Sequence, residues 1–290
     1  MNGVINVLKP PAMSSNGVTV YLKKLLNEKR VGHAGTLDPG AAGVLVVLLG
    51  RTARLSDYLM GHDKIYLAEM HFGCTTDTLD SYGTVLETRM PVRKITLEGV
   101  RRACAAFVGQ ITQMPPAYSA IKVNGRKSYE LARKGINIPK PPRNVQIYAI
   151  EVLEQTGPLQ FLLRICCSKG TYVRTLVEDI AASMGELAYT SLLVREKSGD
   201  YDIQHAYTLD EIAEMALAGD FSFCISPERV VEKLPAVHLG REQRFAIEHG
   251  QLLTADYPIP SGQFALYCDN VFYGIGIEEG GHPKLKIPLY

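Results

Sequence analysis

Six consecutive apolar residues, 44–49 (VLVVLL), place the first constraint on this chain. An apolar run of this length predicts a buried β-strand and is far too short to span a bilayer. Further strands are predicted at residues 64–73, 144–154, 160–167 and 190–196, and helices at 14–29, 96–109 and 171–185. Strands therefore interleave with helices, and several neighbouring strands are expected to be antiparallel. The pattern predicts an α+β fold, with a mixed, largely antiparallel sheet flanked by helices.

The C-terminal part of the sequence predicts a second, smaller domain. A boundary is expected around residues 222–236. Beyond it, the stretch 264–277 (FALYCDNVFYGIGI) predicts a β-hairpin with Asp269 and Asn270 in its turn. We therefore expect a large domain over residues 1–225 and a compact, β-rich domain over residues 234–290.

Charge is unevenly distributed, although the formal net charge is only +1. Seven basic residues and one acidic residue lie between Lys122 and Arg143, which gives this segment a local charge of +6. Such a cluster marks an anionic partner or forms a solvated face. Most of these basic residues lie in the stretch MPPAYSAIKVNGRKSYELARKG, where Tyr118 and Tyr129 are interleaved with them. Basic residues beside aromatic ones suit RNA, which offers phosphates to the first and unstacked bases to the second.

The cysteines and the N-terminus indicate a reducing compartment. None of the six cysteines forms a CxxC pair, so the sequence predicts no zinc site. The N-terminal stretch MNGVINVLKPP lacks the apolar region and the cleavage site of a signal peptide. We expect a cytoplasmic protein without a membrane-spanning segment.

Asp38 lies between a glycine-rich approach and the apolar run, in the stretch 32–43 (GHAGTLDPGAAG). One interpretation is purely structural, because Asp-Pro-Gly is favourable turn chemistry. The other is catalytic, because a carboxylate fixed beside the end of a buried strand suits nucleophilic or acid–base work.

Arg174 and Tyr66 each allow two interpretations. Arg174 follows the stretch KGTY and falls in the first turn of a predicted helix, where a cation opposes the helix dipole. It pairs either with Asp38, which would orient that carboxylate, or with Glu178 one turn later on the same helix. Tyr66 either stacks on a base or packs into the core from the face of its strand.

Four stretches, taken together and in this order, resemble the bacterial TruB-type tRNA pseudouridine-55 synthases. They are GHAGTLDPGAAGVL, DKIYLAEMHFGCTTDT, MPPAYSAIKVNGRKSYELARKG and CSKGTYVRTLVEDI. The resemblance runs from about residue 3 to 200. The tail, residues 234–290, resembles less strongly the small RNA-binding PUA-like domain that is often appended to these enzymes. The resemblance implies the pseudouridine-synthase fold. It also implies isomerisation of uridine 55 in the T-loop of tRNA, with no metal or cofactor.

The resemblance also assigns roles at the reacting base. Asp38 matches the catalytic aspartate, which acts as nucleophile or base in opening the glycosidic bond. Arg174 is expected to pair with it. Tyr66 is expected to stack on the uracil and help the proton shift at C5. Tyr172 and Leu193 are expected to line the uracil pocket.

The remaining roles concern RNA binding. His33 is expected to fill the space that the uridine leaves when it flips out of the T-loop. Lys9 is expected to contact the RNA backbone, as is a thumb-like segment over residues 119–143 that includes Arg126 and Lys127. The expected partner is the T-arm of tRNA, with no obligatory protein partner.

The chain departs from the family pattern at Leu8, Ala12, Ser14, Ala34 and Ala42. These changes concern RNA contacts and loop geometry rather than Asp38, Arg174 or Tyr66. Two other functions remain possible at this point. One is an RNA-binding or RNA-folding module without catalysis. The other is a pseudouridine synthase for another RNA that works with partner proteins.

Overall fold

The computed structural model describes residues 1–92, 94–116, 118, 122–123, 126–127 and 140–290, and only the backbone at 122–123 and 126–127. Ten strands form one large sheet. Their bounds are β1 (Gly3–Lys9), β2 (Val31–His33), β3 (Ala42–Leu49), β4 (Lys64–Phe72), β7 (Gly109–Gln113), β10 (Arg143–Gly157), β11 (Gln160–Cys167), β12 (Ala188–Ser198), β13 (Tyr201–Asp202) and β14 (Cys224–Ile225).

The strand order of this sheet is β14-β1-β3-β12-β4-β11-β10-β7, with β2 on β3 and β13 on β12. Every pairing is antiparallel except β3 with β12, where Ala42 lies opposite Val194 and Gly43 opposite Arg195. Gly43 has φ +104°, and a β-carbon there would overlap the backbone of Arg195. Only glycine therefore suits the point where the two halves of the sheet meet. The expected mixed, largely antiparallel sheet is confirmed.

Seven helices and three short 3₁₀ turns are present in the described residues. They are α1 (Ser15–Leu25), α2 (Ser56–Met60), α3 (Leu97–Ala105), α5 (Val173–Ser183), α6 (Leu209–Leu217), α7 (Pro227–Val230), α8 (Arg244–Glu248), η1 (Gly50–Leu55), η2 (Ile203–His205) and η3 (Arg241–Gln243). None of them is long and apolar enough to cross a membrane.

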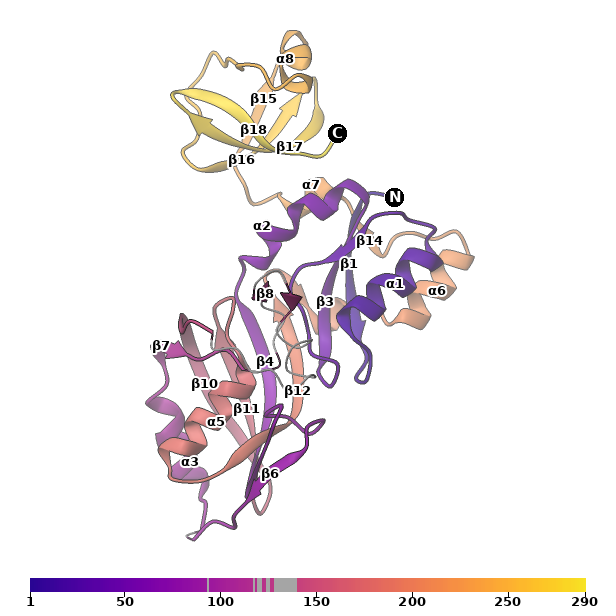
Figure 1. Ribbon diagram of the computed structural model, residues 1–290. Helices are drawn as coiled ribbons and strands as arrows, with labels where there is room; N and C mark the ends of the chain where they lie inside the picture. The colour runs from indigo at the N-terminus through magenta and orange to yellow at the C-terminus, as the bar shows by residue number, and fades with distance from the viewer. Residues whose placement is uncertain (93, 117, 119–121, 124–125, 128–139) are drawn as a thin grey trace.

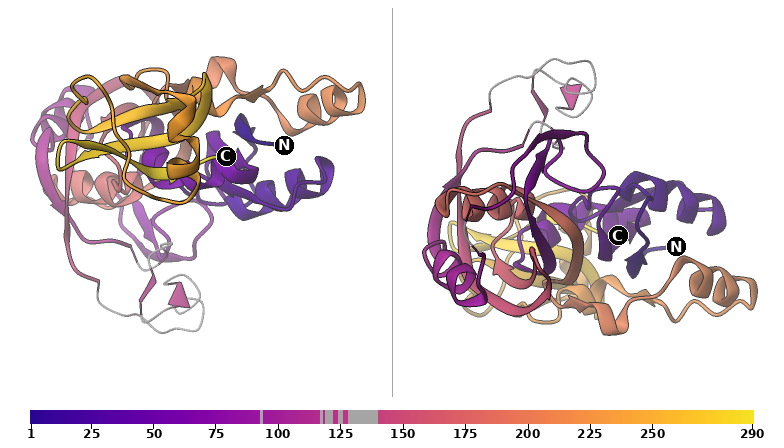
Figure 2. Two further views of the ribbon diagram at one scale, coloured as in Figure 1. Left: turned by 90° about the horizontal axis from the view of Figure 1, so that it is seen from above. Right: turned by 90° about the horizontal axis from the view of Figure 1, so that it is seen from below.

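Two apolar clusters cover the large sheet. Side chains from α1 and α6 pack on β1 and β3, and side chains from α3 and α5 pack on β4, β10 and β11. The two helix groups lie at opposite ends of the molecule (Figures 1 and 2). Tyr66 and Leu193 pack against both clusters. Both side chains therefore lie at the junction of the two half-sheets.

The C-terminal strands form a separate four-stranded sheet in the order β15-β16-β17-β18, above the large one in Figure 1. Their bounds are β15 (Ala236–Leu239), β16 (Gln263–Cys268), β17 (Val271–Glu279) and β18 (His282–Pro288). Asp269 and Asn270 have φ of 51° and 61°, as the expected hairpin turn requires.

The C-terminal sheet does not have a wholly separate core. Phe272, Ile275 and Leu289 pack in one apolar cluster with Val46 and Leu48 of β3. The sequence predicts two domains, over residues 1–225 and 234–290. In the structure, residues from both ranges pack together in this apolar cluster.

Two small hairpins complete the description: β5 (Cys74–Thr76) with β6 (Val85–Thr88), and β8 (Lys122–Val123) with β9 (Arg126–Lys127). The second belongs to the expected thumb-like segment. Most of that segment, and the side chains of Arg126 and Lys127, lie outside what the structure describes.

The helix expected over residues 96–109 is shorter in the structure. It ends at Ala105, and Gly109, with φ +116°, begins β7 instead of ending the helix. Thr96 caps the helix as expected, since its hydroxyl accepts a hydrogen bond from the Gly99 N–H.

Candidate active site

Asp38 lies in the loop between β2 and β3, where it is both a turn residue and part of an ion pair. Its carbonyl accepts a hydrogen bond from the Ala41 N–H at 3.1 Å, which closes a tight turn over Pro39 and Gly40. Its carboxylate, with 36% of the side chain exposed, points out of that turn toward Arg174. The two interpretations that the sequence allowed are therefore compatible, because the turn uses the backbone of Asp38 and leaves its side chain available.

The Asp38 loop is held by hydrogen bonds from two buried polar side chains. The Ser15 hydroxyl donates to the carbonyl of Leu37 and accepts from its N–H, both at 2.8 Å. The Lys9 ammonium donates to the carbonyls of Pro10, Met13 and Pro39 at 2.8, 2.6 and 3.3 Å. These bonds fix the loop that presents the carboxylate.

Lys9 therefore has a different role from the expected one. Its side chain is completely buried, so in this structure it cannot contact an RNA backbone. Its place at the end of β1 puts it under the Asp38 loop, where three carbonyls replace water around the ammonium. Burial lowers the pKa of Lys9 to about 8, while the nearby Asp38 carboxylate acts in the opposite direction.

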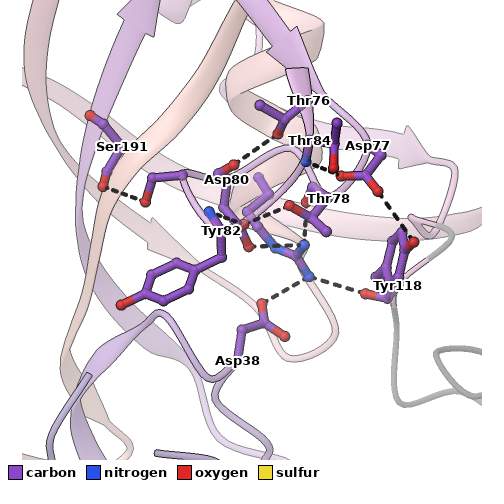
Figure 3. A network of polar contacts seen from close by, with 11 residues as sticks. Asp38, Thr76, Asp77, Thr78, Asp80, Tyr82, Thr84, Tyr118 and Ser191 are labelled. Atoms are coloured by element: carbon purple, nitrogen blue, oxygen red, sulfur yellow. Dashed lines mark hydrogen bonds and ion pairs between the residues drawn. The ribbon is translucent and has the colours of Figure 1, made fainter. Parts of the chain in front are cut away.

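Arg174, the second residue of α5, is held by four partners. Its Nη2 lies 2.9 Å from Asp38 Oδ2 and donates to the Tyr118 carbonyl at 3.1 Å. Its Nη1 lies 3.3 Å from Asp80 Oδ2 and donates to the Thr78 carbonyl. The side chain is 4% exposed, and these partners surround the guanidinium in Figure 3. The expected pair with Asp38 is present, and the alternative partner Glu178 is not among these contacts.

The electrostatic environment of Asp38 has opposing parts. Burial raises the pKa of its carboxyl, and the neighbouring Asp80 carboxylate acts in the same direction. The guanidinium of Arg174 and the ammonium of Lys9 lower it. Arg174 therefore offsets part of the cost of a negative charge at this position.

Tyr66 projects from β4 at the junction of the two half-sheets. Burial raises the pKa of its phenol, and the nearby Arg195 guanidinium opposes that rise by charge and by a hydrogen bond. Asp38 also influences Tyr66, raising the same pKa. Tyr66 is therefore close enough to Asp38 for the two groups to share one electrostatic environment.

Tyr172 and Leu193 lie on the elements that flank this centre. Tyr172 precedes α5, and the Arg143 guanidinium lies 5.6 Å from the centroid of its ring. Leu193 lies on β12 and lines a crevice together with Asp38, Asp80 and Arg174. His33 is the last residue of β2, directly before the Asp38 loop.

Comparison with known proteins identifies the family. The model of the N-terminal domain of TruB family pseudouridylate synthases matches residues 23–173. The tRNA pseudouridine synthase B of Caldanaerobacter subterraneus subsp. tengcongensis is 43% identical over 281 residues, which cover 97% of this chain and 96% of that protein. This chain belongs to the TruB family. The protein of the same name from Streptococcus sanguinis is 40% identical over 262 residues, 88% of each chain.

Solved structures give the same fold for this TruB-family chain. The crystal structure of a Cbf5–Nop10–Gar1 complex matches with a TM-score of 0.73 and 26% identity, covering 99% of this chain and 85% of the matched one. The structure of an H/ACA RNP bound to a substrate RNA containing 2′-deoxyuridine has a TM-score of 0.71, with the same coverage of both chains. At 24% identity, the second match supports the fold alone.

Three residues around the centre of this TruB-family chain carried no signal that the sequence analysis used. Asp80 holds Arg174 from the side opposite Asp38. Arg195, 1% exposed, donates to the carbonyls of Val44 and Gly35 at 2.7 and 3.1 Å. Buried Gln113 forms two hydrogen bonds with the backbone of Tyr172. Arg195 and Gln113 lie in strands of mixed polarity, AYTSLLVREKS and GQITQ, so the sequence alone does not mark either side chain as buried.

Two departures from the TruB pattern have a structural setting. Ala34 is completely buried in an apolar cluster, so its methyl group fills core space. Ala12, where the family commonly has glycine, has φ +63°, in the left-handed region that favours glycine. In the described residues, no group of three or more His, Cys, Asp or Glu side chains is arranged to hold a metal ion.

Proposed function

We propose that this protein converts uridine 55 in the T-loop of tRNA to pseudouridine. The observation that carries the proposal is the Asp38–Arg174 pair beside Tyr66, at the junction of the two half-sheets of a TruB-family chain. The relatives are named tRNA pseudouridine synthase B, which supports tRNA as the substrate class.

The reaction is an isomerisation, so atoms and electrons balance within the nucleotide. The bond from ribose C1′ to uracil N1 breaks, the base rotates, and a bond forms between C1′ and C5. C5 loses a proton and N1 gains one. No cofactor takes part in this scheme.

We assign the opening of the glycosidic bond to the Asp38 carboxylate, acting as nucleophile or base. Arg174 keeps it ionised and oriented, because an arginine beside a carboxylate favours the charged form. Tyr66 stacks on the uracil and assists the proton shift at C5, while Tyr172 and Leu193 line the pocket. Asp80 positions Arg174, and Arg195 positions Tyr66. Neither Asp80 nor Arg195 touches the substrate.

The target uridine is stacked inside the folded T-loop, so it must be extruded before Asp38 can reach it. In this proposal His33 fills the space that the base leaves. The basic segment 119–143, with Arg126 and Lys127, and the C-terminal sheet contact the RNA backbone. Binding through phosphates predicts an affinity for tRNA that falls as salt concentration rises.

The first test is to incubate the purified protein alone with an unmodified tRNA transcript and to map pseudouridine along it. We expect one new pseudouridine at position 55, and none with Asp38→Asn. Asp200→Asn is the matched control, because Asp200 is an exposed carboxylate that pairs with Lys233 in a different pocket. Binding without turnover in the wild type would support the RNA-binding module instead.

A second test addresses the substrate and the partners. We expect an isolated T-arm stem-loop to be modified with no other protein present. Direct binding of tRNA without a partner protein also fits the proposed cytoplasmic location of the enzyme. Activity that needs a guide RNA or a partner protein would favour the synthase for another RNA. Replacing Arg126 and Lys127 together is expected to raise KM more than it lowers kcat.

A further inference from the structure

A large exposed aromatic side chain lies at the mouth of the crevice that contains Asp38. Tyr82, in the turn between β5 and β6, is 60% exposed and lines this crevice together with Asp38, Gly40 and Leu193. No hydrogen bond holds the Tyr82 hydroxyl to any described residue. One part of the ring is covered by protein and the rest faces solvent.

The ring is seated on the loop that carries the catalytic carboxylate. A β-carbon at Gly40 would overlap the Tyr82 ring, so the ring rests directly on the glycine of the Asp38-Pro39-Gly40 turn. Figure 3 shows the ring extending from the Asp80 region toward that loop. Any side chain at position 40 would therefore displace the ring.

The backbone of Tyr82 is tied to the same carboxylate that holds Arg174. Asp80 Oδ1 accepts from the Tyr82 N–H at 3.0 Å and from the Thr78 hydroxyl at 2.6 Å, while Asp80 Oδ2 pairs with Arg174. The Ser81 hydroxyl donates to the Ser191 carbonyl on β12 at 3.2 Å. The backbone of Tyr82 is therefore held in place by these hydrogen bonds, while its ring is exposed.

The crevice is narrow in the structure without RNA, so its walls must move apart to admit the extruded target base. Its free volume is about 10 Å³, which is room for about one water molecule. The target uridine takes up the space next to Asp38, and the exposed Tyr82 ring at the rim of the crevice is left for a neighbouring nucleotide.

We propose that Tyr82 is the stacking platform for the base of a nucleotide next to the target uridine in the substrate RNA. This inference rests on the proposed function and adds a residue that sets affinity for the RNA. Once the target base has been extruded, the base on each side of it loses a stacking partner on one face. His33 fills the vacated space in the proposed function, and the exposed Tyr82 ring beside the pocket covers the face of one neighbour that has left the stack. Base–aromatic stacking tolerates any base, because every base has a π face.

The test compares Tyr82→Phe, Tyr82→Leu and Tyr82→Ala on an unmodified T-arm stem-loop. The phenylalanine variant keeps the ring and is expected to stay within about twofold of the wild type. The leucine and alanine variants are expected to raise KM by roughly 5- to 150-fold, the range of one lost base stack, and to change kcat by less than about threefold. Tyr148→Leu is the control, since Tyr148 is a tyrosine of similar exposure on β10.

The partner nucleotide is identified by abasic substitutions on either side of the target uridine, with Kd measured in the Asp38→Asn background. One of the two substitutions is expected to weaken binding when Tyr82 is present and to cost nothing more once Tyr82 is leucine. Equal costs in both backgrounds, or a leucine variant with wild-type KM, would overturn the proposal. A fall in kcat at constant KM would also overturn it, because Tyr82 would then act only through Asp80 and Arg174.

The two proposals fail in different ways. A wild-type protein that forms no pseudouridine removes the proposed function, while the coupling between Tyr82 and the abasic position can still be measured as binding. A wild-type protein that modifies position 55, with Tyr82 variants that behave like it, removes only the stacking platform. Thermal unfolding of all three variants shows that the comparison is made on folded protein.

Discussion

Gln113 holds the backbone of Tyr172 by two hydrogen bonds. Its Nε2 donates to the Tyr172 carbonyl at 3.2 Å, and its Oε1 accepts from the Tyr172 N–H at 3.0 Å. Gln113 is completely buried at the end of β7, and Tyr172 is the residue directly before α5. One amide thus fixes the start of the helix that carries Arg174.

We expect Gln113→Leu to lower the free energy of unfolding by about 2–4 kcal/mol, because two buried backbone groups lose their partners. Activity should fall with it, since Tyr172 and Arg174 lose their fixed positions. Gln110→Leu, an exposed glutamine on the same strand, is the control and should change stability by less than about 0.5 kcal/mol. Denaturant unfolding measures both. Equal effects of the two substitutions would show that the Gln113 bonds contribute little.

The pH dependence of activity follows from Asp38. Burial places its pKa above that of an ordinary aspartate, and the proposed reaction needs the carboxylate ionised. Activity should therefore be lost, as pH falls, at a higher pH than an unperturbed aspartate would give. The acidic limb of kcat/KM measures this pKa in the free enzyme.

The same shift has a consequence for stability. A carboxyl whose pKa is higher in the folded than in the unfolded protein stabilises the fold when protonated, and this contribution is lost as pH rises through the folded pKa. The stability of the wild type relative to Asp38→Asn should decline over that pH range. A difference that does not change with pH would contradict the raised pKa.

Asp80→Asn tests the second carboxylate on Arg174. Loss of one charged partner should leave the Asp38 pair in place but less firmly oriented. We expect kcat to fall by roughly 10- to 100-fold, equivalent to about 1.5–3 kcal/mol for a charge-assisted hydrogen bond, with KM nearly unchanged. Single-turnover rates at saturating RNA measure the effect. A variant with wild-type kcat would make Asp80 dispensable.

Lys9→Met tests the buried ammonium under the Asp38 loop. The pKa of about 8 in the folded protein lies below the unfolded value, so between about pH 8 and 10.5 the unfolded chain binds the extra proton. The free energy of unfolding of the wild type should therefore rise with pH over this interval, relative to Lys9→Met. Lys29→Met, at an exposed position, is the control for the loss of a lysine charge at the surface.

Ile275→Ala tests the apolar cluster shared by the two sheets. Ile275 is completely buried, and we expect a loss of about 2–5 kcal/mol in the free energy of unfolding. Because the cluster joins both sheets, one cooperative transition should be seen by every probe. Val271→Ala, at a 56% exposed position on the same strand, is the control. Two separate transitions would show that the sheets unfold independently.

Local features of the fold were predictable because local chemistry decides them. The apolar run at 44–49 is the buried part of β3, and the Asp269–Asn270 turn has the positive φ values that its residue types favour. The C-terminal end of α3 was not predictable. Residues 106–108 continue the helical pattern, and the chain leaves the helix there because Gly109 begins a strand.

The site residues that belong to sequence motifs could be predicted. Those whose surroundings depend on contacts between distant parts of the chain could not. The expected pairing of Asp38 with Arg174 is confirmed. The burial of Lys9 depends on carbonyls from residues 10, 13 and 39, which meet only in the folded chain. Asp80 offered no signal, because a carboxylate in a polar turn is ordinarily solvated. The roles of Asp38, Tyr66, His33, Tyr172 and Leu193 in the reaction stay predictions.

The parallel contact between Gly43 and Arg195 also sets an order in which parts of the site can assemble as the chain is synthesised. The two residues are separated by about 150 positions, which a ribosome adds in roughly 8–30 s. Until β12 has emerged, β3 lacks its neighbour at the junction, and Asp38 has no wall formed by Leu193. A nascent chain that ends before β12 therefore lacks part of the site around Asp38, so the complete site is among the last features that the growing polypeptide acquires.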